Sequence, residues 1–236
     1  MNRLFSQEFL NANMMGPNAL LFAEEVCDSL NLRPGMRVLD LACGTGLTSM
    51  YLASKYGVEV VAMDLWITAE DNASRFEAMG FRQQITPLHM DVADLPHQKP
   101  FAENSFDALI SIDAYHYFGA SSMFFDYHLA PYLKAGAGVA ILIPGLKAPF
   151  NHGIPPEMAP FWHSGMNFFT VNWWQQLWQQ SAFLQMNVCT ESECCYQAWQ
   201  EWLACDHEYA IRDRKMMAIE AGRFFNFTKM IGRINK

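Results

Sequence analysis

The sequence predicts an α/β fold with a doubly wound, mostly parallel sheet. Short apolar runs recur along its first part, and segments of about 15 to 30 residues with helical character separate them. This alternation is typical of βαβ units. A glycine turn follows the first run, and acidic residues follow three of the runs. The predicted strands are residues 37–41, 59–63, 85–89, 106–112 and 139–143.

The elements around these strands follow from local patterns. Apolar residues spaced by three and four predict an amphipathic helix over 17–30. The run 139–143 lacks polar alternation, as expected for a central strand, and should end at Pro144-Gly145. Trp174 and Trp178 share one face of a predicted helix and should belong to the core. Further predicted elements are a proline-rich aromatic loop over 144–170, helices over 47–56, 172–180 and 196–224, and strands over 183–190 and 227–233.

Composition limits the classes of function. The 236 residues are 51% hydrophobic and 17% charged, which suits a single domain over 1–236. The formal charge of −8 shows no footprint for a phosphate backbone, so a nucleic-acid partner is disfavoured. Residues 1–22 lack the features of a signal peptide, and no stretch is long enough to span a bilayer. We therefore expect a cytoplasmic protein with reduced thiols.

The cysteines near the C-terminus raise the alternative of a metal site. Cys194 and Cys195 are adjacent and do not form a CxxC chelate, and the remaining spacings fit no zinc motif. Ordinary packing is the favoured interpretation of Cys189, Cys205 and His207, and no metal is expected.

The run Val38-Leu-Asp-Leu-Ala-Cys-Gly-Thr-Gly46 carries the strongest chemical signal. Gly44 and Gly46 let the backbone turn tightly and approach a ligand, and the following helix offers unpaired N–H groups there. Asp40, Asp64 and Asp91 end or follow three strands, so they should share the carboxyl edge of the sheet.

These acids also bear on the cofactor. A carboxylate at the end of the second strand suits two ribose hydroxyls. A dinucleotide fingerprint would need a third glycine where Ser49 stands, and Asp40 would repel a pyrophosphate but attract a sulfonium and an amino group. A nicotinamide-dependent oxidoreductase is therefore disfavoured.

Together with VVAMD, MDVADLP, FDALISIDAYHYF and LKAGAGVAILIPG, this run resembles the class I S-adenosylmethionine-dependent methyltransferases, in the small-molecule branch similar to quinone- and sarcosine-type enzymes. The resemblance covers residues 34–145. It implies a Rossmann-like seven-stranded sheet with five parallel strands and a final antiparallel strand, and a helical cap inserted near the C-terminus. It also implies S-adenosyl-L-methionine as cofactor and S-adenosylhomocysteine as product of an in-line methyl transfer.

The resemblance carries roles over to particular residues. Asp64 would hold the ribose hydroxyls, and Asp91 with the Val92 backbone would meet the adenine amine. Leu65 and Trp66 would pack on the adenine, although Trp66 could equally cover the sheet edge. Ser111 lies on the fourth strand, beside the expected methyl position. The residues expected around the methionine and ribose are Asp40, Ala42, Gly44 and Gly46, with Ala42 at a position where the family usually has glycine.

The turn after the fourth strand suggests the chemistry. His116 is the candidate base for an acceptor that must lose a proton, and packing in the turn is the alternative. Tyr115 is expected in the acceptor pocket. Residues 113–116 lack the prolines of the turn that marks enzymes acting on nucleic-acid amines, which favours a small-molecule acceptor.

Residues 144–170 and 191–226, with 6–16, are expected to form a cap that shapes the acceptor pocket, while 34–145 forms the cofactor-binding core. Trp162, Trp199 and Trp202 are the candidate cap residues of that pocket. A non-catalytic S-adenosylmethionine-binding regulatory or partner protein is the alternative function. The sequence leaves the acceptor atom and the oligomeric state open.

Overall fold

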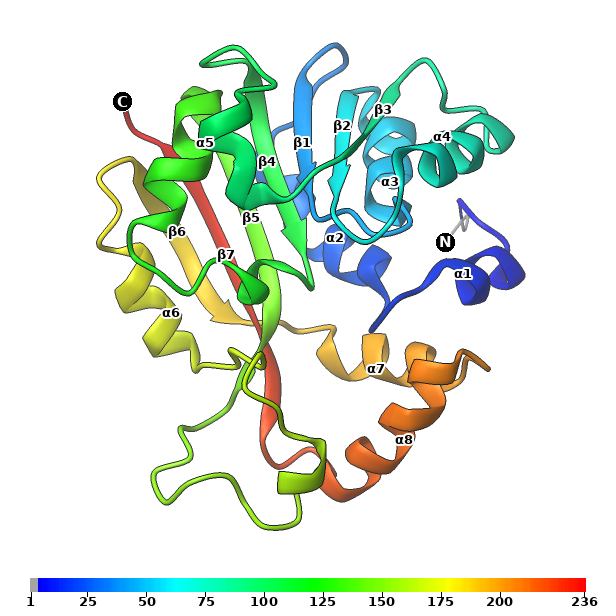
Figure 1. Ribbon diagram of the computed structural model, residues 1–236, viewed down its shortest axis with the longest axis vertical. Helices are drawn as coiled ribbons and strands as arrows, with labels where there is room; N and C mark the ends of the chain where they lie inside the picture. The colour runs from blue at the N-terminus through cyan, green and yellow to red at the C-terminus, as the bar shows by residue number, and fades with distance from the viewer. Residues whose placement is uncertain (1–3) are drawn as a thin grey trace.

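The computed structural model describes residues 4–236, which form a seven-stranded sheet of order β3-β2-β1-β4-β5-β7-β6 (Figure 1). Residues 1–3, which belong to the segment 1–22 that was compared with a signal peptide, lie outside the described residues. Between residues 4 and 236 no helix is long and apolar enough to cross a membrane.

The five predicted parallel strands are confirmed, although the fifth begins at Leu133 and not at residue 139. β2 and β3 lie in succession on one side of β1, and β4 and β5 on the other, all parallel to their neighbours. The strand order reverses next to β1, which is where ligands bind in open parallel sheets. Their bounds are β1 Arg37–Leu41, β2 Glu59–Asp64, β3 Ile85–His89, β4 Phe106–Ile112 and β5 Leu133–Leu146.

The last two strands, β6 (Leu184–Glu191) and β7 (Phe225–Ile234), complete the sheet, and β7 is antiparallel to both β5 and β6. The prediction that β5 ends at Pro144-Gly145 is wrong. The strand continues to Leu146, because β7 pairs with it through Gly145 and Leu146. Beyond Leu142, β4 no longer pairs with β5, and a strand with one free edge tolerates proline.

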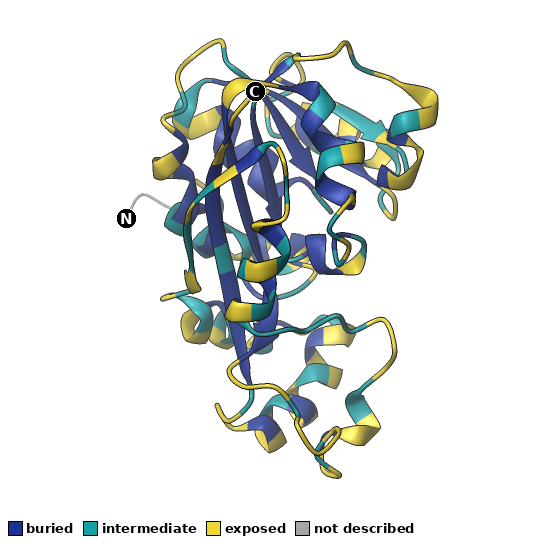
Figure 2. Cartoon of the chain, turned by 90° about the vertical axis from the view of Figure 1, so that its left-hand side faces the viewer, coloured by how far each residue is buried: buried dark blue, intermediate teal, exposed yellow. Residues whose placement is uncertain are grey.

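Helices cover both faces of the sheet, as the alternation of buried side chains requires. Val38 and Val60 face α2 and α3, whereas Leu39 and Val61 face the layer that contains Trp174 and Trp178 of α6. The five inner strands β1, β2, β4, β5 and β7 are the most deeply buried part of the molecule, whereas the edge strands β3 and β6 are partly exposed (Figure 2). The helices are α1 Gln7–Asn13, α2 Ala19–Cys27, α3 Leu47–Tyr56, α4 Ala69–Ala78, α5 Leu95–Gln98, α6 Val171–Trp178, α7 Cys195–Leu203 and α8 Glu208–Glu220. Short 3₁₀ turns span Asp28–Leu30, Val92–Asp94, Tyr115–Tyr117, Ala130–Tyr132 and Ala159–Phe161, and a π turn spans Phe125–Leu129.

The helical segment predicted over 196–224 is two helices, not one. α7 ends at Leu203, and the extended residue His207 caps the start of α8 by accepting a hydrogen bond from the Tyr209 N–H. The helical spacing of apolar residues continues through both helices, so the sequence pattern did not indicate this break. The separate helices allow α8 to turn back and pack its Met216 with Met158 of the 144–170 loop below the sheet (Figure 1).

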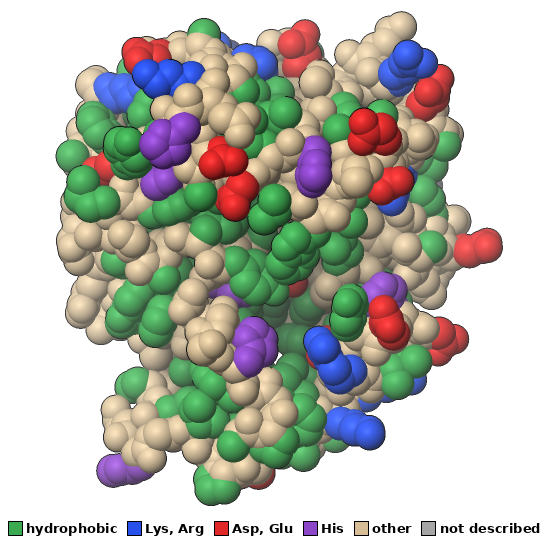
Figure 3. All heavy atoms as spheres, viewed as in Figure 1, with side chains coloured by type: hydrophobic (Ala, Val, Ile, Leu, Met, Phe, Trp, Pro, Cys, Tyr) green, Lys and Arg blue, Asp and Glu red, His purple; other side chains and the backbone are tan. Residues whose placement is uncertain are grey.

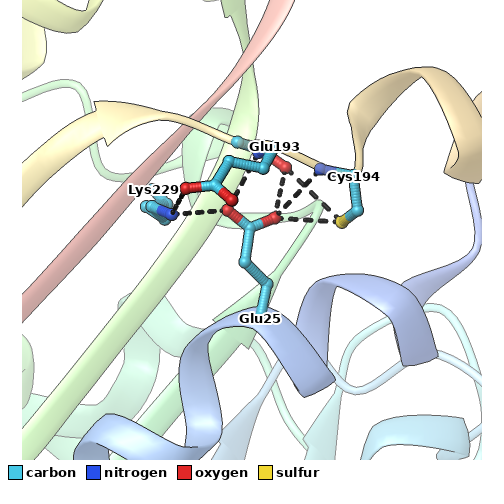
Figure 4. Close-up of polar contacts among 5 residues, drawn as sticks. Glu25, Glu193, Cys194 and Lys229 are labelled. Carbon is cyan, nitrogen blue, oxygen red and sulfur yellow. Dashed lines mark hydrogen bonds and ion pairs between the residues drawn. The ribbon is translucent and has the colours of Figure 1, made fainter.

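A buried ion pair ties this C-terminal region to the sheet and to α2 (Figure 4). The Lys229 ammonium on β7 lies 2.6 Å from the Glu25 carboxylate on α2, and both side chains are largely buried. Glu25 also accepts hydrogen bonds from the Ser192 hydroxyl and from the Glu193 and Cys194 N–H groups. Burial opposes its charge, but donors from Cys194, Lys229 and Ser192 lower the Glu25 pKa to about 2. The carboxylate thereby fixes the start of α7 against the core.

Candidate active site

A cavity opens at the carboxyl ends of the parallel strands, in the hollow between the sheet and the C-terminal region (Figure 3). Its lining contains Asp40 at the end of β1, Asp64 at the end of β2, Asp91 after β3 and Asp113 after β4. The sequence predicted that the first three acids meet at one edge, and the structure places all three there. Most of the remaining lining is apolar or backbone, which suits a site for a small organic molecule.

The glycine turn between β1 and α3 forms one wall of this cavity. Gly44 and Gly46 have φ values of 55° and 79°, so both occupy the left-handed region that favours glycine. Gly44 lines the cavity, whereas Gly46 caps α3 and lies against the Phe76 ring, which a Cβ would overlap. Gly46 therefore supports the turn on the side away from the cavity, against Phe76. Ala42 also lines the cavity with a φ of 57°, which explains why glycine suits this position.

Asp64 organises the loops on both sides of it. One carboxylate oxygen accepts the Gly44 N–H at 2.8 Å, and the other accepts the N–H groups of Trp66 and Ile67 at 2.7 and 2.8 Å. The side chain is buried but lines the cavity. A carboxylate has about four acceptor positions, so it keeps room for a ligand hydroxyl.

Asp40 is the most deeply placed acid of the site. Its carboxylate accepts a hydrogen bond of 2.6 Å from Ser49, the residue that replaces the third glycine of a dinucleotide fingerprint. Burial, with the nearby charge of Asp64, raises the Asp40 pKa to about 7 despite the Ser49 hydroxyl. A positively charged ligand group would relieve the cost of ionising it.

The residues predicted to meet the adenine also line the cavity. Asp91 accepts the Ala93 N–H at 2.9 Å, and Val92 lies beside it in the lining. Leu65 and Trp66 line the mouth and are both exposed, and the Trp66 ring lies 5.3 Å from that of Tyr117. Ser111 does not reach the cavity. It is fully buried, and its hydroxyl donates to the Leu41 carbonyl, which ties β4 to β1.

The two residues predicted to act on the acceptor lie outside the cavity lining. His116 is 2% exposed, contacts the rings of Tyr117 and Phe168, and leaves Nδ1 without a partner among the described residues. Burial lowers its pKa to about 3, which makes the ring a poor proton acceptor near neutral pH. Tyr115 is buried in the core against Trp174 and Trp178. The 3₁₀ turn over Tyr115–Tyr117 instead brings Tyr117 to the cavity.

The three cap tryptophans are likewise absent from the lining. Trp162 packs against Phe150 and Phe168. Trp199 contacts Phe227, and the buried Trp202 donates a hydrogen bond of 3.0 Å to Asp213 on α8. They hold the C-terminal region together and join it to the sheet.

Sequence reasoning missed several lining residues. The segment after α1 crosses the cavity and contributes Met15 and Gly16, where the sequence indicated only a general cap role for 6–16. Its position is fixed by the Thr45 hydroxyl, which donates to the Asn13 carbonyl at 2.6 Å. Asp113 and Tyr117 belong to the fourth-strand motif, but only the left-handed turn at Asp113 shows which members of it face the ligand.

The residues that the structure describes contain no group of three or more His, Cys, Asp or Glu side chains placed to hold a metal ion. The thiols of Cys189 and Cys194 are shielded, and burial raises the pKa of each to about 12.

Part of this chain is similar in sequence to known proteins. Residues 38–127 match a family described as a methyltransferase domain. Phosphoethanolamine N-methyltransferase 1 of Arabidopsis thaliana is 33% identical over 111 residues, which are 47% of this chain and 21% of that protein. Cyclopropane-fatty-acyl-phospholipid synthase of Escherichia coli K12 is 35% identical over 95 residues, or 40% of this chain and 22% of the synthase. The chain thus spans about a fifth of the length of these relatives.

Solved structures extend the similarity of fold to most of the chain. Phosphoethanolamine N-methyltransferase 2 of Haemonchus contortus, in complex with S-adenosyl-L-methionine, has a TM-score of 0.73 at 15% identity, covering all of this chain and 59% of the other. Geranyl diphosphate C-methyltransferase of Streptomyces coelicolor, in complex with S-adenosyl-L-homocysteine, gives 0.71 at 14%, covering 92% and 80%. Residues 38–127 thus match a methyltransferase domain, and the fold of this chain is that of the solved methyltransferases.

Proposed function

We propose that this protein is an S-adenosylmethionine-dependent methyltransferase acting on a small-molecule acceptor. The observation that carries the proposal is the convergence of the glycine turn with Asp40, Asp64 and Asp91 in one cavity at the strand ends. S-adenosylmethionine supplies an electrophilic methyl group whose bond to sulfur breaks as the bond to the acceptor forms.

The donor set of the cavity fits this ligand. Asp64 keeps acceptor capacity for a ribose hydroxyl, and the Asp91–Val92 turn offers polar backbone for an adenine edge. Asp40, Asp64 and Asp91 favour the positive charges of a sulfonium and an amino group. No lysine or arginine occurs among the described residues of the lining, so a pyrophosphate would find no cationic partner. This favours a sulfonium over a dinucleotide.

The protein's own contribution to methyl transfer is alignment and exclusion of water. Residues Met15–Gly16 of the N-terminal segment border the cavity. The neighbouring rings of Trp66 and Tyr117 border it as well. In this proposal the 34–145 core binds the cofactor, and 144–170 and 191–226 hold the acceptor side in place. His116 shapes the turn by packing, since its ring does not line the cavity.

Two measurements test the proposal. Titration calorimetry should detect S-adenosylmethionine binding, and a screen of amine, hydroxyl, thiol and carbon acceptors should yield S-adenosylhomocysteine with at least one class. Binding without turnover by any class would favour a non-catalytic S-adenosylmethionine-binding protein. Absence of binding would refute both.

A further inference from the structure

Asp113 is an acid that the proposed cofactor contacts do not use. It follows β4 with a φ of 57°, and its N–H donates to the Leu142 carbonyl at 2.7 Å, which fixes the residue to β5. Its side chain lines the cavity. Gly16 passes directly over it, because a Cβ there would lie 2.5 Å from Oδ2. The N-terminal segment thus covers one side of the Asp113 carboxyl group, and the side that faces the cavity stays accessible to a ligand.

The Asp113 carboxyl group has no partner within the part of the chain that the structure describes. No donor reaches it, and no lysine or arginine pairs with it. Burial, followed by the negative charge of Asp213, raises its pKa to about 8. Asp113 is half-buried and lines the cavity. A carboxyl group shielded in this way without a donor or a counter-charge is costly, so a ligand in the cavity is the natural source of that partner.

The surroundings favour a cation over a neutral donor. Asp213 of α8 approaches from the C-terminal region, held by Trp202, and burial raises its pKa as well. Tyr117 lies near both acids: burial and the charges of Asp113 and Asp213 raise its pKa to about 12. Its ring provides an aromatic face at the same place, which attracts cations.

The arginine beside Asp213 does not meet this need. Arg212 lies beside Asp213 at 3.9 Å, but its side chain is 71% exposed and its guanidinium lies over the Tyr209 ring. The described lining contains four aspartates and no lysine, arginine or histidine. A phosphate or carboxylate on the acceptor would therefore find repulsion instead of a partner.

We propose that the acceptor is an amine, whose nitrogen is bound by the Asp113 carboxyl group beside Tyr117, with Asp213 supplying further negative charge from the cap. This inference rests on the proposed function for the position of the cofactor. The lone pair of the unprotonated amine nitrogen would form the bond to the methyl carbon while the carbon–sulfur bond breaks and S-adenosylhomocysteine leaves. The positive charge thereby passes from sulfur to nitrogen, where the Asp113 carboxylate stabilises it.

The test uses the full-length protein, saturated with S-adenosylhomocysteine, and measures probe binding by thermal shift and calorimetry. Tetramethylammonium chloride is the cationic probe, tert-butyl alcohol is its neutral counterpart, and sodium chloride controls for salt. We expect the cation alone to bind the parent, and Asp113→Asn to weaken it by at least ~10-fold. Asparagine tolerates the left-handed turn. Glu70→Gln, at an exposed position on α4, is the matched control and should behave like the parent.

Equal responses of the parent and Asp113→Asn, or equal binding of the alcohol, overturn the inference. So does efficient methylation of a hydroxyl, thiol or carbon acceptor that Asp113→Asn leaves unchanged. Calorimetry with S-adenosylmethionine separates the two proposals. Cofactor binding without preference for cations overturns only the amine acceptor, whereas failure to bind the cofactor overturns the proposed function.

Discussion

The Glu25 carboxylate on α2 and the Lys229 ammonium on β7 lie 2.6 Å apart, and the same carboxylate binds the N–H groups at the start of α7. One acid thus connects the N-terminal helix, the sheet and the C-terminal region. Both charges are largely buried, so removal of one leaves the other uncompensated.

Glu25→Gln should therefore lower the free energy of unfolding by about 2 to 4 kcal/mol at pH 7. The folded-state pKa of Glu25 is depressed from its ordinary value of 4.5, so this stabilisation is present above that value and is lost as pH falls toward 2. Urea unfolding of parent and variant at pH 7 and pH 3 measures the difference. A difference that does not shrink at pH 3 would contradict the assigned ion pair.

Gly46 should be irreplaceable for packing. Gly46→Ala places a Cβ into the Phe76 ring and strains a backbone with φ of 79°, so we expect a loss of about 2 kcal/mol or more in stability. Gly80→Ala is the control, because Gly80 has a φ of 80° and open space around its Cβ position. Thermal unfolding measures both variants. Gly80→Ala reports the cost of backbone strain alone, and Gly46→Ala reports the cost of strain together with the overlap on Phe76. Equal losses would show that Phe76 does not constrain the turn.

Asp113 should destabilise the ligand-free protein as pH rises. Its folded-state pKa of about 8 exceeds its ordinary value of 3.8, so between these values the folded protein holds a proton that the unfolded chain has lost. The free energy of unfolding attributable to Asp113 therefore falls as pH rises through this window. Asp113→Asn should stabilise the protein by roughly 1 to 3 kcal/mol at pH 8 and by little at pH 4. Chemical unfolding at both pH values measures this, and a variant less stable than the parent at pH 8 would oppose it.

Trp162→Ala should affect stability more than ligand binding, because Trp162 packs on Phe150 and Phe168 and does not line the cavity. We expect a loss of about 2 to 4 kcal/mol in unfolding free energy and a nearly unchanged affinity for S-adenosylmethionine. Calorimetry and urea unfolding on the same preparation give both values. A large loss of S-adenosylmethionine affinity in a stable variant would show that Trp162 contributes to the ligand site.

The sequence predicted the sheet and its acidic edge well because both depend on local patterns. The runs ending at Leu41 and Ile112 keep their predicted bounds, and glycine at 44 and 46 fits the observed turn. The end of β5 was wrong because its pairing with β7 depends on residues some 80 positions away.

The acceptor side was harder to predict for the same reason. Spacing alone placed Trp174 and Trp178 correctly in the core. It could not show that Tyr115 faces those tryptophans while Tyr117 faces the cavity, since a 3₁₀ turn decides this. The sequence could not single out Asp113, because the residues that lie near it in space, Gly16 and Asp213, are distant from it in the sequence.

The central claim is that the Asp64 edge binds S-adenosylmethionine, and calorimetric titration of the cofactor into the parent and Asp64→Ala tests it most directly. We predict binding to the parent and a loss of about 2 to 3 kcal/mol in the variant, because a ribose hydroxyl loses a charged acceptor and the Gly44 N–H loses the carboxylate that holds its turn in place. Glu70→Gln serves as the control, and thermal unfolding confirms that each variant is folded. Equal affinity in the parent and a folded Asp64→Ala, or tighter binding of a nicotinamide dinucleotide than of S-adenosylmethionine, would contradict the claim.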